Sequence, residues 1–126
     1  MLGNATLTAF VATTDAARSK SFYGGTLGLP LLSEDQFALV FDCGGIQLRI
    51  QVLKELRPQS FTVLGWHVAD VRRTASALAM RGVTLERYPY LQQDDLGVWQ
   101  APSRARVAWF KDPDGNLLSV TEPAAA

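Results

Sequence analysis

The chain has 126 residues, of which 48% are apolar and 19% charged, which excludes a disordered protein and favours one globular domain. Twelve basic residues balance twelve acidic ones, and this zero net charge argues against a nucleic-acid partner. No apolar run approaches the roughly 20 residues that cross a bilayer, no signal-peptide pattern is present, and the single cysteine excludes an intrachain disulfide. We therefore expect a cytoplasmic protein without a membrane partner.

The first half of the chain predicts a strand, a short helix and three more strands. Residues 7–13 are rich in Thr, Val and Phe, as is typical of strands. Thr14 or Asp15 can cap a helix over residues 15–23, and Gly24 with Gly25 is expected to end it. The next three strands are expected near residues 31–33, 37–41 and 46–53.

After a linker over residues 54–60, the same order of elements is predicted again. Asp70 is expected to cap a helix with apolar residues at helical spacing, and Gly82 to follow its end. Strands are expected at residues 61–68, 83–87, 107–110 and 117–120, with a possible short one at residues 98–100 of the long connection over residues 88–106. The doublets Arg72-Arg73 and Asp94-Asp95 are expected to be solvated.

The segment Asp112-Pro113-Asp114-Gly115 predicts a tight turn between the last two strands. Proline presets φ for the first central position of a turn, and the Asp-Gly pair supplies a side-chain acceptor and a residue that tolerates positive φ. Because apolar runs flank the turn on both sides, we expect a β-hairpin that fixes the register of the last strand.

Two strands alternate between apolar and other residues. Ile46, Leu48, Ile50 and Val52 form one face of a strand whose other face is Gln47, Arg49 and Gln51; Leu64, Trp66 and Val68 oppose Val63, Gly65 and His67. The apolar faces are expected to pack against the two helices. Alternation alone leaves open whether the other faces meet water or line a cleft, and it does not assign Trp109 to a face.

The ordered set of motifs resembles the glyoxalase/bleomycin-resistance/extradiol dioxygenase superfamily, also called vicinal oxygen chelate. The motifs are Asp15 with Phe22-Tyr23 and Leu27-Gly28-Leu29, Gly44-Gly45 with Leu48, Val68-Ala69-Asp70 with Arg81-Gly82-Val83, and the run from Phe110 to Asn116. The resemblance implies an α+β fold of two βαβββ modules, at about 5–56 and 60–122 of one domain over residues 1–126. It also implies a curved mixed sheet around a cavity, and a homodimer.

The resemblance also implies four positions for metal ligands, here Thr8, Arg49, Val63 and Ser119. A divalent ion requires imidazole or carboxylate donors, and none of these side chains supplies one. We therefore expect no metal site of the family type and no cofactor.

Arg49 and His67 are the strongest candidates for chemistry on the face implied to line a cavity. Arg49 can bind a carboxylate or phosphate, or it can be a surface residue; His67 can be an acid–base catalyst or a structural residue. Tyr88, Tyr90 and Trp99 can cover an apolar ligand or form a small core of their own. The expected ligand-binding residues are Arg49, Gln47, Gln51, His67, Thr8, Phe10, Ser119 and Trp99.

The leading hypothesis is a metal-free protein that binds a partly apolar, anionic small molecule, similar to the drug-sequestering bleomycin-resistance type. The alternative is an enzyme of the same superfamily. It would be metal-independent, with His67 moving a proton and Arg49 stabilising an oxyanion, or it would be a metal-dependent lyase or dioxygenase such as a glyoxalase. A third class, a small interaction module, has no motif in its favour.

Overall fold

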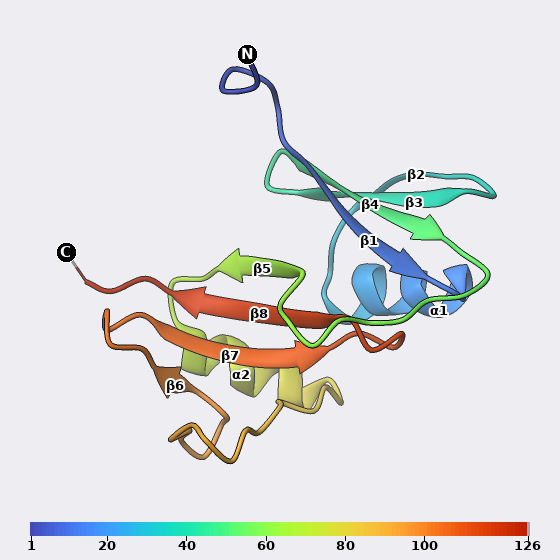
Figure 1. The fold of residues 1–126 in the computed structure, drawn as a ribbon. Helices are drawn as coiled ribbons and strands as arrows, with labels where there is room; N and C mark the ends of the chain where they lie inside the picture. The colour runs from blue at the N-terminus through green and yellow to red at the C-terminus, as the bar shows by residue number, and fades with distance from the viewer. Residues whose placement is uncertain (126) are drawn as a thin grey trace. The chain divides into compact units, whose positions relative to one another are not determined.

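The computed structural model describes residues 1–125, which divide into a first unit, residues 1–58, and a second unit from Gln59 onward. Each unit contains one four-stranded sheet, with strand orders β1-β4-β3-β2 and β5-β8-β7-β6 (Figure 1). The strands are β1 (Thr8–Thr13), β2 (Leu31–Glu34), β3 (Ala38–Cys43), β4 (Ile46–Val52), β5 (Leu64–His67), β6 (Trp99–Gln100), β7 (Arg106–Lys111) and β8 (Leu117–Glu122). The predicted α+β fold of two βαβββ modules is confirmed.

In both sheets the first strand runs parallel to the last, and the other neighbours are antiparallel. The core of the first unit follows from the predicted alternation of β4, where Leu48 and Ile50 are fully buried. Phe41 on β3 lies beside Leu48 and contacts the buried ring of Tyr23, at 6.2 Å between ring centroids. Burying each of these side chains stabilises the fold by about 1.5–3 kcal/mol.

The first helical segment is longer than predicted. It consists of α1 (Ala16–Lys20) and the π-helical η1 (Ser21–Thr26). Asp15 caps it as expected, because its carboxylate accepts a backbone N–H of the first turn. The prediction that Gly24 and Gly25 end the helix is wrong, since both lie inside η1, next to the fully buried Tyr23. The glycine that follows this helical segment with positive φ is Gly28, at +75°.

The second helix, α2 (Val71–Met80), packs against β7 and β8. Asp70 caps α2 by accepting the N–H of Arg73 at 3.1 Å, and Gly82 follows its end with φ of +87°, as predicted. The buried residues of the helix are Val71, Ala75 and Leu78. None of the helices formed by residues 1–125 is long and apolar enough to cross a membrane.

The predicted strand over residues 83–87 is wrong. Of these residues only Leu85 forms a β-bridge, with Phe110, and the N–H of Glu86 donates to the carbonyl of Trp109 at 2.7 Å. The rest of the β7 edge pairs with β6. The outer edge of β7 is therefore covered in two pieces, and residues 87–98, which we call the insert, leave the sheet between them.

The hairpin between β7 and β8 is confirmed. The N–H of Gly115 donates to the carbonyl of Asp112 at 2.9 Å, and Gly115 has φ of +88°. The buried carboxylate of Asp112 also accepts the backbone N–H and the side-chain amide of Asn116, at 2.9 and 2.8 Å. This closed turn fixes the register that places Trp109 opposite Ser119.

Candidate ligand-binding site

The sheet face of the first unit that is turned away from its core carries five of the predicted site residues. Thr8 lies beside Gln47 and Phe10 beside Arg49 in the parallel pair of β1 and β4, and Gln51 follows on the same face. Phe10 is 52% exposed and Arg49 is half-buried. This face combines one exposed ring with amides and a cation.

The guanidinium of Arg49 forms no hydrogen bond within residues 1–125, although it lies in the field of a carboxylate. That carboxylate is Asp35, whose oxygen accepts the N–H groups of Phe37 and Ala38 at 2.8 and 3.0 Å. These backbone hydrogen bonds, and to a smaller extent the charge of Arg49, hold the pKa of Asp35 below its usual value. The N–H donors of this guanidinium are therefore not used by other residues of the described chain.

The corresponding face of the second unit carries Trp109, Ser119 and Gly65 in one row across β7, β8 and β5. This assigns Trp109 to the face away from α2, which the sequence left open. His67 and Trp99 lie at opposite ends of the next row, three strand spacings or about 14 Å apart. The imidazole of His67 is exposed and forms no hydrogen bond within residues 1–125.

The residues at the four metal-ligand positions do not fit a metal ion. Thr8 and Arg49 belong to the first unit, and Ser119 to the second; Val63 lies just before β5, where its N–H donates to Leu117 at 3.0 Å. Their side chains include no carboxylate or imidazole. Elsewhere in residues 1–125, no three His, Cys, Asp or Glu side chains are grouped so that they could hold a metal ion.

Four aromatic rings of the second unit form a continuous chain. The ring centroids of Tyr90 and Tyr88 are 5.6 Å apart, those of Tyr88 and Trp109 5.6 Å, and those of Trp109 and Trp99 5.9 Å. Tyr88 meets Trp109 edge-on at 87°, whereas the planes of the two tryptophans differ by 33°. These are the separations of favourable aromatic pairs, so the rings support one another.

The rings line an open cavity of about 290 Å³ in the second unit. This volume is at the lower end of the range for small-molecule sites. Its lining residues are Ser60, Phe61, Thr62, Tyr88, Tyr90, Leu91, Trp99, Trp109 and Leu117, and we call it the aromatic pocket. None of the residues that line it carries a charge. Tyr90, at 78% exposure, lies at its rim.

Burial raises the pKa of Tyr88, and the negative charge of Glu86 and the neighbouring Tyr90 raise it further. Its phenol is therefore protonated at neutral pH and can donate a hydrogen bond. Together with the hydroxyls of Ser60 and Thr62, it gives an otherwise apolar pocket a few polar contacts.

The insert that carries Tyr88 and Tyr90 is held by side chain to backbone hydrogen bonds. The Gln93 side chain accepts the N–H of Tyr88 at 2.7 Å and donates to the carbonyls of Glu86 and Gly97 at 2.8 and 2.9 Å. Gln93 also forms a β-bridge with Trp99. One glutamine thus ties together the two ends of the insert and fixes the backbone of two rings of the pocket.

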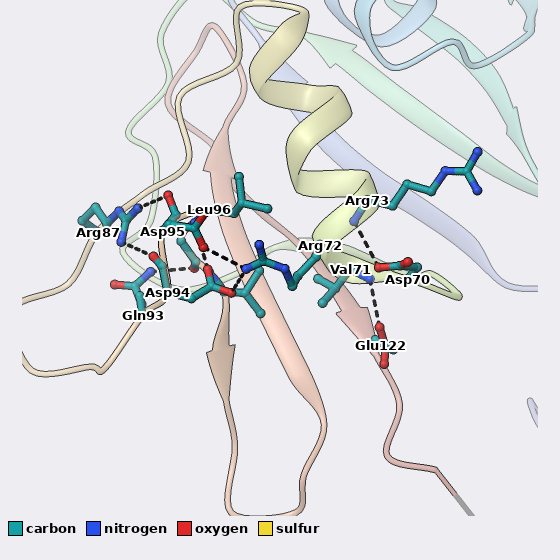
Figure 2. Close-up of polar contacts among 12 residues, drawn as sticks. Asp70, Val71, Arg72, Arg73, Arg87, Gln93, Asp94, Asp95, Leu96 and Glu122 are labelled. Atoms are coloured by element: carbon teal, nitrogen blue, oxygen red, sulfur yellow. Dashed lines mark hydrogen bonds and ion pairs between the residues drawn. The ribbon is translucent and has the colours of Figure 1, made fainter.

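A second set of contacts ties the insert to α2 (Figure 2). Arg72 forms ion pairs with Asp94 and, at 2.9 Å, with Asp95, and Arg87 donates to the carbonyls of both aspartates at 2.6 and 2.8 Å. The Asp94-Asp95 and Arg72-Arg73 doublets are at least partly exposed to solvent, as predicted, but three of the four residues also form ion pairs that the sequence did not predict. Only Arg73 points away from the insert.

These contacts shift the titration of Asp94. Burial acts to raise its pKa, but the N–H groups of Val98 and Leu96 and the Arg72 guanidinium outweigh burial and hold the pKa below its usual value. The two N–H groups donate to one carboxylate oxygen at 2.9 Å each. Asp94 therefore remains ionised at neutral pH, and its carboxylate binds two backbone N–H groups within the insert.

The chain is thus a small α+β protein with an aromatic pocket in its second unit. Residues 6–120 match the family model described as the Glyoxalase/Bleomycin resistance protein/Dioxygenase superfamily. The chain belongs to this superfamily, as the motifs predicted.

Similar proteins agree with this assignment. A Bacillus subtilis (strain 168) protein with the description "Uncharacterized protein YraH" is 32% identical over 122 residues, which cover 84% of this chain and 88% of that protein. A glyoxalase family protein from Enterococcus faecalis has a TM-score of 0.75 at 21% identity, covering 97% of this chain and all of that one. A lactoylglutathione lyase from Agrobacterium tumefaciens has a TM-score of 0.74 at 16% identity, covering 94% and 93%. At these identities the solved structures show a shared fold.

Proposed function

We propose that this protein binds a small, partly apolar organic molecule without the help of a metal ion, and that the aromatic pocket holds the apolar part. The observation that carries the proposal is the chain of four rings around a cavity of about 290 Å³. Aromatic walls with a few polar groups are typical of sites for small organic ligands. The residues at the family's metal positions offer no suitable donors, which supports binding without metal.

We also propose that Arg49, with Gln47 and Gln51, binds an anionic group on the sheet face of the first unit, because within residues 1–125 the guanidinium forms no hydrogen bond. The proposal also includes a homodimer, as the family resemblance implies. Acid–base catalysis by His67 is not proposed, because the imidazole is exposed and does not line the pocket.

The test is a thermal-shift screen of small aromatic compounds, with and without EDTA and divalent metals. A compound at 100 times its Kd stabilises the protein by about 2.7 kcal/mol, which raises Tm by several degrees. We expect hits that are insensitive to EDTA and are lost in Trp109→Ala. The control is Met80→Ala, a change at an 86% exposed residue outside the pocket, and it should bind normally.

Two results would overturn the proposal. The first is elemental analysis that finds about one tightly bound zinc, nickel, manganese or iron per chain. The second is a set of hits that stabilise Trp109→Ala as much as the wild type.

A further inference from the structure

The arrangement of charged residues around the aromatic pocket indicates which ligand charge the pocket can accept. No lining residue is charged. Charged groups on and beside the insert have partners elsewhere: Glu86 lies 3.6 Å from Lys111, and Asp94 and Asp95 are paired with Arg72. The guanidinium of Arg87 donates to two backbone carbonyls of the insert. A carboxylate or an ammonium that entered the pocket would lose water without gaining a partner of opposite charge, which is costly.

The geometry of the rings favours a flat group. Trp99 and Trp109 present faces that differ by only 33°, and Tyr88 meets Trp109 edge-on. A planar aromatic ring can make offset and edge contacts with such walls, which adds about 0.5–1.5 kcal/mol per pair beyond the burial of area. A cation could also use the ring faces, but no carboxylate lines the pocket to offset its desolvation.

The volume of the pocket and the hydroxyl groups that line it limit the class of ligand further. A cavity of about 290 Å³ is small for a drug-sized molecule, so one or two fused rings are the expected occupant. The hydroxyls of Ser60 and Thr62 and the protonated phenol of Tyr88 can bond a neutral amide, carbonyl or hydroxyl group.

We infer that the group held in the aromatic pocket is an uncharged, planar aromatic ring system of one or two rings that carries a neutral polar substituent. The inference rests on the proposed function and adds the ligand class of its apolar subsite. Any anionic end of the natural ligand lies outside this pocket.

The test compares four probes by isothermal titration calorimetry at pH 7. Naphthalene-2-carboxamide is neutral, 2-naphthoate carries a negative charge on the same ring system, and 2-naphthylmethylammonium carries a positive charge. Decahydronaphthalene-2-carboxamide keeps the amide but is not planar. The titrations use an Arg49→Ala background, so that the guanidinium of Arg49 cannot attract the anion.

We expect the naphthalene carboxamide to bind at least tenfold more tightly than each of the other three probes. Its affinity should fall at least tenfold in Trp109→Ala and in Tyr88→Leu and remain unchanged in Met80→Ala. Far-UV circular dichroism checks that each variant is folded, and if Trp109→Ala is not, Tyr88→Leu decides.

The other outcomes separate the two proposals. If 2-naphthoate, the ammonium or the saturated amide binds as tightly as the carboxamide, the ligand class is wrong while small-molecule binding stands. If no probe binds, or if both pocket variants bind the carboxamide normally, the proposed function fails as well. If sedimentation shows that Trp109→Ala changes the oligomeric state, the occupant of the pocket is a second copy of the chain, which also overturns the inference.

Discussion

The two units share their strand order but differ in the sheet face that is turned away from the helix. In the first unit this face carries amides, an exposed phenylalanine and Arg49, whose guanidinium forms no hydrogen bond within residues 1–125. In the second unit the same face carries Trp99 and Trp109, covered by the tied insert. The same topology therefore supports a polar surface in one copy and an aromatic pocket in the other.

The difference has a structural origin at the edge of each sheet. In the first unit, β2 pairs with β3 along four residues with one irregularity. In the second, the equivalent edge is split between the bridge at Leu85 and the two-residue β6. The split lets twelve residues leave the sheet and supply Tyr88 and Tyr90 to the pocket. A second difference lies opposite Arg49 and Ser119, where the first unit has Phe10 and the second has Gly65.

The largest expected effects on stability come from truncating a buried phenylalanine in the core of each unit. Phe41 and Phe110 are buried at 0% and 1% exposure in the cores of the first and second unit. We expect Phe41→Ala and Phe110→Ala each to lower the free energy of unfolding by about 3–5 kcal/mol, because truncation removes burial and leaves a cavity. Urea denaturation measures this. A loss below about 1 kcal/mol in one variant only would show that the two cores are not equivalent.

Loss of the ion pairs between Arg72 of α2 and the two aspartates of the insert should mainly lower ligand affinity. Replacing Arg72 by Met removes both ion pairs, and we expect about tenfold weaker binding of an aromatic ligand because the insert must then be ordered on binding. The loss of stability should be small, as for other solvent-exposed ion pairs. Calorimetry and urea denaturation separate the two effects.

Arg73→Met is the matched control for Arg72→Met, since Arg73 is adjacent on the same helix and points away from the insert (Figure 2). It should leave affinity unchanged. Equal losses of affinity in both variants would mean that the positive charge on α2 is responsible, and not the ion pairs of Arg72 with the insert.

Lowering the pH should weaken the contacts of the Asp94 carboxylate in the insert over a defined pH range. Because the folded pKa of Asp94 is below the unfolded value of about 3.9, its contribution is complete above that pH and is lost as the pH falls through the folded value. We expect constant ligand affinity from pH 7 to about 5 and a decline below about pH 4. In Asp94→Asn affinity should be reduced at pH 7 and less dependent on acid. A decline between pH 7 and 5 would contradict this assignment.

The smallest expected effect on stability concerns Arg49. Because its guanidinium forms no hydrogen bond within residues 1–125, Arg49→Ala should change the free energy of unfolding by less than about 0.5 kcal/mol. The same variant should lose the binding of anionic compounds found in the thermal-shift screen. Unchanged binding of these compounds would remove Arg49 from the site and leave only the second unit with a binding role.

Much of the fold could be predicted because its signals are local. The caps Asp15 and Asp70, the alternation in β4 and the turn at Asp112–Asn116 depend on residues close in sequence. The predictions failed where a tertiary contact outweighed a local preference. Gly24 and Gly25 were expected to end a helix, but both lie inside η1 beside the fully buried Tyr23; residues 83–87 have the composition of a strand but pair only at Leu85.

The candidate site was predicted only in part. Trp99 and the tyrosines of the insert were recognised as residues able to cover a ligand or form a small core, and the structure places them around a cavity. Trp109 was undecided and Arg72 and Gln93 were missed as supports of the pocket. No sequence signal joins Arg72 to Asp94, because 22 residues separate them and both are ordinary surface residue types.

By itself, the sequence determined the two-module fold, the family and the lack of suitable donors at the family's metal positions, because these depend on residue type and short-range spacing. Only the tertiary structure decided that Trp109 faces the pocket, that the edge of β7 is split, and that the charges around the rings are paired. These features depend on strand register and on contacts between distant segments, which residue order along the chain does not specify.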